Sequence, residues 1–153
     1  MRASATVSIE ACPQDVWDYF ANVMNLERWV RGVSRVHLQG DALARQGLRF
    51  TSHYTYGGRT LPVEWEVAAE EPAQSLELHW TSGPFTYAGR LGFAEEGGGT
   101  RVEYTVDTGA NGRMTRLTLG ALGWPLAWLM SRQLRSDLKR ARSDVRSAES
   151  RVT

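Results

Sequence analysis

Residues 48–69 read LRFTSHYTYGGRTLPVEWEVAA. They contain two segments in which hydrophobic and polar residues largely alternate, and a glycine turn joins the two. In the first segment every second side chain from Leu48 to Tyr56, including Phe50 and Tyr54, is expected to face one way. The residues between them are polar and are expected to face the other way. The same period of two recurs in the second segment, around Trp65. Because successive side chains of a strand point to opposite faces of a sheet, this pattern predicts two strands that bury one face. The Gly57–Gly58 pair is typical of a tight antiparallel hairpin.

The alternation continues on both sides of this hairpin. We predict strands at residues 5–10, 34–39, 48–56, 61–69, 76–81, 85–93 and 102–106. Short runs of glycine, proline and polar residues separate the later strands, and short connections favour antiparallel neighbours. The sequence therefore predicts a sheet of about seven strands with one buried face and one solvent-exposed face.

Helical spacing marks two short segments after the first strand and a long one at the C-terminal end. Pro13 begins the first, and residues 25–29 form the second. In the long segment the expected core-facing residues are spaced about 3.5 residues apart, at Leu134, Leu138, Ala141 and Val145. A sheet with one apolar face must be covered, so we expect this helix to cover it. Pro125 is expected to bend or break the helix.

Composition excludes several classes of protein. The net charge of +1 gives no global field for nucleic acid. Cys12 is the single cysteine, and the three histidines stand in no metal-binding spacing, so we expect no disulfide, metal or cofactor. The N-terminus lacks the apolar run of a signal peptide, and the most apolar stretch, residues 117–130, is too short to span a membrane. We expect a cytoplasmic protein.

This order of elements, with short motifs along it, resembles the START/Bet v 1-like (SRPBCC) superfamily and, within it, the polyketide cyclase/dehydrase and lipid-transport group. The supporting motifs are Ile9–Phe20, Asn25–Trp29, Trp65–Val67, Leu78–Trp80, Gly99–Val102 and Leu134–Arg140. The resemblance implies an α+β helix-grip fold, in which a curved antiparallel sheet surrounds a long C-terminal helix, as one domain over residues 1–153. It also implies a cavity between sheet and helix.

We expect that cavity to bind or carry a hydrophobic small molecule such as a lipid, a polyketide or an isoprenoid. The expected ligand-binding residues are Phe50, Tyr54, Trp65, Trp80, Tyr87, Tyr104, Gly120 and Trp124. Gly89 on the inner face leaves a gap among the rings that something must fill, and small residues facing large rings are consistent with tight interdigitation or with a pocket. Two alternatives stay open: the rings fill the interior themselves, or the protein is a cyclase- or dehydratase-like enzyme acting through Tyr54 and Tyr104.

The first half of the long helix carries a second apolar side, formed by Leu119, Leu122, Leu126 and Leu129. A helix that is apolar all round needs cover on every side. A second copy of the chain or a membrane surface would supply that cover, and we expect a homodimer contact or a cavity gate in preference to membrane docking. The basic residues that follow would suit an anionic membrane surface, and they would equally suit a solvated helix end.

Overall fold

The structure is a computed structural model that describes residues 2–83, 85–110 and 123–152. Its strands are β1 (Arg2–Ile9), β2 (Val33–His37), β3 (Arg49–Tyr56), β4 (Arg59–Glu71), β5 (Ser75–Ser82), β6 (Phe85–Glu96) and β7 (Gly99–Ala110). Its helices are α1 (Pro13–Ala21), a 3₁₀ turn (Val23–Asn25), α2 (Leu26–Trp29) and α4 (Gly123–Val152). Over the described residues the chain thus runs as one strand, two short helices, six strands and a long helix, which confirms the predicted order.

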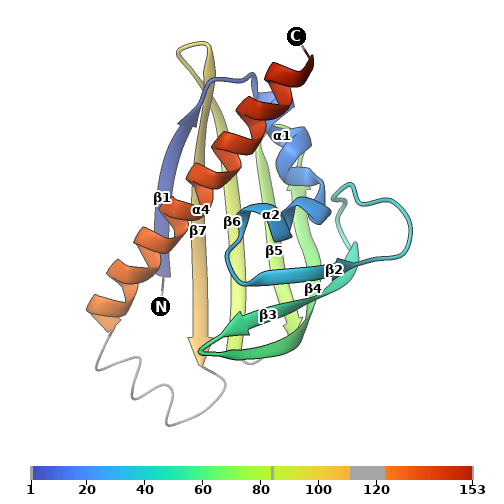
Figure 1. Cartoon of the computed structure of the whole chain (residues 1–153), viewed down its shortest axis with the longest axis vertical. Coiled ribbons are helices and arrows are strands. Elements are labelled where there is room, and N and C mark those ends of the chain that lie inside the picture. Colours follow the sequence, from blue (N-terminus) through green and yellow to red (C-terminus); the bar gives the residue numbers. More distant parts are fainter. Residues whose placement is uncertain (1, 84, 111–122, 153) are drawn as a thin grey trace.

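All seven strands form one antiparallel sheet in the order β1-β7-β6-β5-β4-β3-β2. Strands β2 to β7 follow one another as a meander, and β1 pairs with β7 along its whole length, from Arg2 opposite Asp107 to Ile9 opposite Thr100. Tight turns with two glycines at positive φ join β3 to β4 and β6 to β7. Figure 1 shows the resulting curved sheet with α4 lying across it.

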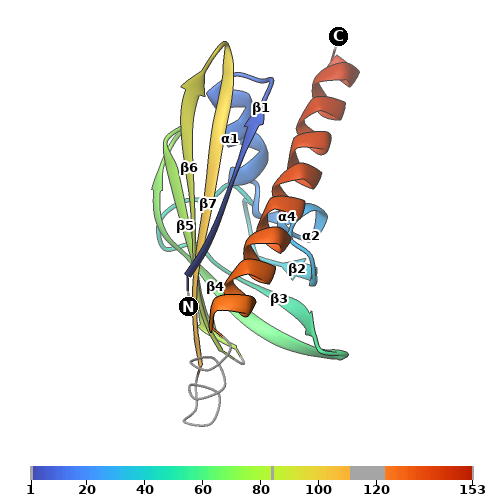
Figure 2. The same cartoon turned by 90° about the vertical axis from the view of Figure 1, so that its left-hand side faces the viewer.

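The long helix covers the concave face of the sheet. The four predicted core-facing residues, Leu134, Leu138, Ala141 and Val145, are all buried. In the side view of Figure 2, α4 runs along one side of the strands as a separate layer, close to β1. This is the helix-grip arrangement that the sequence predicted.

The short helices close one end of the interior with aromatic rings. Phe20 of α1 meets Trp29 of α2 edge to face at 5.0 Å, and Trp29 in turn meets Tyr104 of β7 at 5.3 Å. Trp17 packs on Phe93 of β6 at 5.8 Å. These rings are buried, so this end is packed by the protein's own side chains.

Several details differ from the sequence predictions. Strand β1 begins at Arg2, before the predicted start at residue 5, and β7 continues to Ala110, past the predicted end at residue 106. Within the described part of α4, Pro125 stands in the first turn and does not break the helix. A first-turn proline is tolerated because its missing N–H has no intrahelical acceptor there. No helix among the described residues is both long enough and apolar enough to cross a membrane.

Candidate ligand-binding site

Six aromatic rings from β3 to β6 gather on the concave face of the sheet. This aromatic cluster consists of Phe50, Tyr54, Trp65, Trp80, Phe85 and Tyr87. Trp80 is at its centre, because its ring lies 5.0 Å from Phe85, 5.1 Å from Tyr54, 5.2 Å from Tyr87 and 5.7 Å from Trp65.

Strand register brings these rings together. Trp65 on β4 is paired with Phe50 on β3 and with Trp80 on β5. Directly opposed residues of antiparallel strands project from the same face, so the three rings form a row across the sheet. Phe50 and Trp65 stack at 5.5 Å with an angle of 12° between the ring planes.

Burial changes along the aromatic cluster. Trp65 is 1% exposed, whereas Tyr54, Trp80 and Tyr87 are half-buried. Tyr56, at the end of β3, is 65% exposed, although its ring still contacts Phe85 at 5.8 Å. The cluster therefore leads from the closed core toward the end of the sheet that holds the end of β3 and the start of β6.

Some polar atoms within and beside the aromatic cluster have hydrogen-bond partners, and others have none among the described residues. The Trp65 indole N–H donates to Ser52 Oγ at 2.8 Å, and the hydroxyls of Tyr87 and Tyr104 hydrogen-bond to each other. The indole nitrogens of Trp80 and Trp29 are buried, and neither has a hydrogen-bond partner among the described residues. Buried donors normally find an acceptor, so these two N–H groups are the unusual feature of the interior.

The space expected above Gly89 is filled by the protein itself. A Cβ atom at Gly89 would collide with the Tyr87 hydroxyl, which lies over the glycine two residues further along β6. The missing side chain lets Tyr87 reach Tyr104 on β7. Of the two alternatives for the gap at Gly89, tight packing and a pocket, the structure shows packing, because its neighbour two residues earlier on the same face occupies that gap.

All three tyrosines of this region are held in the neutral form. Burial is the main cause that raises the pKa of Tyr54, Tyr87 and Tyr104, and the nearby Asp137 carboxylate acts in the same direction. Neutral phenols donate hydrogen bonds, whereas phenolates do not. Tyr54 and one member of the Tyr87–Tyr104 pair can therefore act as donors toward a ligand oxygen at neutral pH.

Asp137 of α4 is a buried carboxylate that the sequence reasoning missed. It is 3% exposed, and burial raises its pKa to about 6, although Arg140, Gln133 and Arg31 oppose that rise. Its Oδ1 accepts from Gln133 Nε2 at 2.9 Å, from the Arg31 backbone N–H at 3.4 Å and from the Arg140 guanidinium.

Arg140 also donates to the Trp29 carbonyl oxygen, at 3.2 and 3.3 Å. Together Asp137 and Arg140 tie α4 to the turn after α2, next to the buried ring of Trp29. The missed signal was spacing, because position 137 lies three residues after Leu134 and four before Ala141, on the same helix face.

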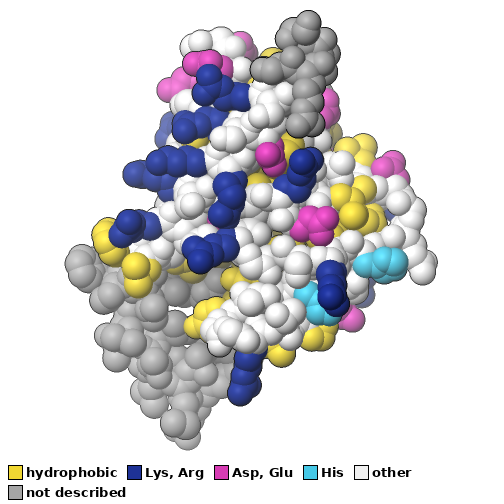
Figure 3. All heavy atoms as spheres, viewed as in Figure 1, with side chains coloured by type: hydrophobic (Ala, Val, Ile, Leu, Met, Phe, Trp, Pro, Cys, Tyr) yellow, Lys and Arg dark blue, Asp and Glu magenta, His cyan; other side chains and the backbone are white. Residues whose placement is uncertain are grey.

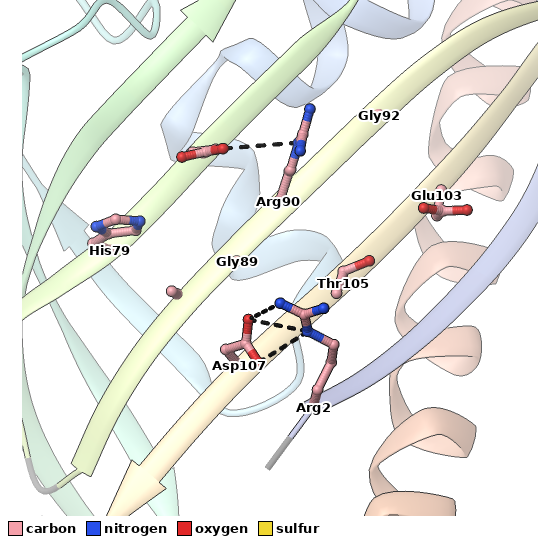
Figure 4. A pocket seen from close by; sticks show the side chains of 10 residues that line it. Arg2, His79, Gly89, Arg90, Gly92, Glu103, Thr105 and Asp107 are labelled. Carbon is pink, nitrogen blue, oxygen red and sulfur yellow. Dashed lines mark hydrogen bonds and ion pairs between the residues drawn. The ribbon is translucent and has the colours of Figure 1, made fainter.

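Hollows outlined by described residues also occur on the outer face of the sheet. One has a volume of about 570 Å³ and lies over β5, β6 and β7, with Gly92 and Ala88 among its lining residues (Figure 4). Its charged rim is internally paired, Arg2 with Asp107 at 3.0 Å and Arg90 with Glu77 at 3.8 Å. A second hollow of about 390 Å³ adjoins it. Exposed ion pairs on an open surface contribute little and point to no particular ligand.

Six of the eight predicted ligand-binding residues come together in the structure. Phe50, Tyr54, Trp65, Trp80 and Tyr87 belong to the aromatic cluster, and Tyr104 joins it through Tyr87. Gly120 lies outside the described residues. Trp124 lies in α4, but its side chain is outside the described part of the chain. The binding role of all eight stays a prediction.

The predicted second apolar side of the long helix is described only in part. Leu119 and Leu122 lie outside the described residues, as does the side chain of Leu126. Leu129 is 53% exposed. The predicted homodimer contact therefore stays a prediction.

Comparison with known proteins agrees with this architecture. The family described as polyketide cyclase/dehydrase and lipid transport matches residues 1–146. The chain therefore belongs to this family. No curated protein sequence matched the chain.

Three solved structures show how widely the fold is shared. A Thermus thermophilus protein, TTHA0849, is 23% identical with a TM-score of 0.73, over 97% of this chain and 99% of that one. The Zhui aromatase/cyclase from Streptomyces sp. R1128 is 15% identical with a TM-score of 0.71, over 100% and 96%. The major latex-like protein 151 of Panax ginseng is 11% identical with a TM-score of 0.68, over 94% and 96%. At these identities the likeness concerns the fold.

Proposed function

We propose that the protein binds a hydrophobic small molecule, of lipid, polyketide or isoprenoid type, against the aromatic cluster between the sheet and α4. The observation that carries this proposal is the state of Trp80. Its ring contacts four other rings, it is only half-buried, and its buried N–H has no partner among the described residues. A side chain of this kind offers apolar contact area and a hydrogen bond at one point.

Affinity and orientation would come from different groups. Apolar surface removed from water contributes about 25 cal/mol per Å², so the rings would supply most of the binding free energy. A buried donor without an acceptor costs about 1–3 kcal/mol, which a ligand oxygen near Trp80 would recover. The preferred ligand is therefore apolar with at least one carbonyl or hydroxyl oxygen.

The family supports this class of ligand without naming a member of it. Its description joins cyclisation or dehydration of polyketides with lipid transport, and both kinds of molecule are largely apolar and carry oxygen atoms. Such a binder would work in the cytoplasm, the location expected from the sequence.

The test compares two rigid probes that differ in one carbonyl group, fluorene and fluorenone. We expect both to raise the melting temperature and to quench tryptophan fluorescence. Trp80→Phe should weaken fluorenone binding about three- to tenfold, the size of one net hydrogen bond, and leave fluorene binding nearly unchanged. Trp17→Phe is the matched control, since Trp17 packs on Phe93 at the other end of the core. If neither probe binds the wild-type protein, the proposal fails.

The hydroxyl pair of Tyr87 and Tyr104 favours a second candidate, a cyclase- or dehydratase-like enzyme. One hydroxyl of the pair donates to the other, and the O–H that stays free, with that of Tyr54, would donate to a substrate carbonyl and make the neighbouring carbon more acidic. The aromatase/cyclase with the same fold is consistent with such chemistry. On an accepted polyketide substrate, Tyr54→Phe and Tyr104→Phe should lower kcat. If turnover is unchanged in both, the enzyme candidate is excluded.

A further inference from the structure

One flank of α4 carries a row of cations with an aromatic residue at its N-terminal end. We call this row the basic stripe; its residues are Trp128, Arg132, Arg135, Lys139, Arg142 and Arg146. They follow one another at intervals of four, three, four, three and four, which on a helix of 3.6 residues per turn gives a single line. The buried residues, such as Leu134 and Leu138, occupy another face.

The charges of the basic stripe are poorly compensated. Arg146 lies 3.7 Å from Glu10, and the Arg132 guanidinium lies 5.0 Å from the centre of the Trp128 ring. Among the described residues, no carboxylate comes within ion-pair distance of the other three cations, Arg135, Lys139 and Arg142.

The strand beside the stripe adds no negative charge. α4 packs against β1, whose residues 2–9 contain neither aspartate nor glutamate. Figure 3 shows dark blue Lys and Arg side chains in a row along one side of α4, with hydrophobic side chains beside the lower end of the row. The result is a row of positive charges along one side of α4 (Figure 3).

The N-terminal end of the stripe is apolar and exposed. Trp128 is 55% exposed and Leu129, next to it, is 53% exposed. Tryptophan has an apolar ring with a polar N–H, which suits the boundary between lipid headgroups and acyl chains. An exposed leucine adjoining it increases the apolar area available for the same contact.

These features together select one kind of partner. A second copy of the chain paired through this face would set cations against cations, which costs free energy. A nucleic acid would take the cations and stack on Trp128, but it offers no apolar surface to Leu129. An anionic lipid surface can bind both the cations of the stripe and its apolar end. The cations would lie among the headgroups, and Trp128 and Leu129 would lie below the headgroups.

We propose that α4 docks on anionic membranes through the basic stripe, with Trp128 and Leu129 entering the interfacial layer. This surface lies outside the concave face, so the proposal is independent of the identity of any bound ligand.

The test is co-sedimentation of the full chain with vesicles of phosphatidylcholine, with and without phosphatidylserine. Wild-type protein should bind the mixed vesicles preferentially, and added salt should weaken the binding. Each cation near such a surface contributes about a fivefold factor, so Arg135→Gln with Lys139→Gln should lower binding about 30-fold. Trp128→Gln should lower it several-fold, and vesicles should shift the tryptophan emission of the wild type to shorter wavelength.

The matched control is Arg90→Gln with Arg101→Gln, which removes the same charge from exposed positions on the sheet. Glutamine keeps a high helix propensity, so the stripe variants should retain the wild-type melting temperature. Equal binding to both kinds of vesicle, or equal loss in the control and stripe variants, would overturn the proposal. It would also be overturned if the wild type bound no vesicles but bound DNA, or formed a dimer that Trp128→Gln dissociates.

Discussion

Replacing Asp137 by asparagine should remove a specific part of the protein's pH dependence. Burial raises the pKa of this carboxyl from its usual 3.8 to about 6 in the folded state. Between these two values the folded protein holds a proton that the unfolded chain has lost. The free energy of unfolding should therefore fall as the pH rises from about 4 to about 6, because ionising Asp137 is harder in the folded state.

The size of this effect follows from the difference between the two pKa values. At about 1.4 kcal/mol for each pH unit, a difference of roughly two units corresponds to about 3 kcal/mol at most. Asp137→Asn keeps the shape and an accepting oxygen but cannot ionise. The stability of the wild type relative to this variant should thus decline by up to about 3 kcal/mol between pH 4 and pH 7.

Urea unfolding followed by tryptophan fluorescence, repeated over this pH range, measures the difference directly. Asp18→Asn is the control, since Asp18 is on the exposed side of α1 and its carboxyl faces water. Parallel stability curves for the wild type and Asp137→Asn would refute the reasoning, as would a relative stability of the wild type that increases with pH.

Two further substitutions test the packing of the interior. Gly89→Ala should destabilise the fold by about 1–3 kcal/mol, because the new Cβ collides with the Tyr87 hydroxyl. Adding Tyr87→Phe should recover part of that loss in thermal unfolding, and no recovery would argue against the collision. Leu138→Ala, at a fully buried position on α4, should cost about 2–5 kcal/mol. Leu129→Ala, at an exposed position of the same helix, should change stability by less than about 0.5 kcal/mol, and similar losses in both would contradict the assigned helix face.

The alternation of hydrophobic and polar residues predicted most of the fold. The alternation at residues 48–69 corresponds to β3 and β4, with Phe50 opposite Trp65 as same-face neighbours. It was reliable because one face of the sheet is buried, so that a one-residue slip would reverse every side chain. Strand ends were less predictable, since β7 runs through Gly109 to Ala110 and keeps its pairing with Phe85 of β6.

The sequence predicted which residues come together at the candidate site, but it did not predict how their side chains pack or hydrogen-bond. The pattern placed Tyr54, Trp80 and Tyr87 on one face, but it could not say which polar atoms would lack partners. Tyr87 fills the space over Gly89, which depends on the rotamer of one side chain. Asp137 was missed because polar groups were sought on the strands only, although its helical position relative to Leu134 placed it on the buried face.

The central claim, that the concave face holds an apolar ligand beside Trp80, is tested most directly by native mass spectrometry of gently purified protein. We expect a fraction of the protein to carry the added mass of one small molecule, and organic extraction should release a largely apolar compound with at least one oxygen. Incubation with fluorenone should replace that molecule and give a complex of one fluorenone per chain. A spectrum of ligand-free protein alone, before and after fluorenone, would contradict the claim and indicate that the rings fill the interior themselves.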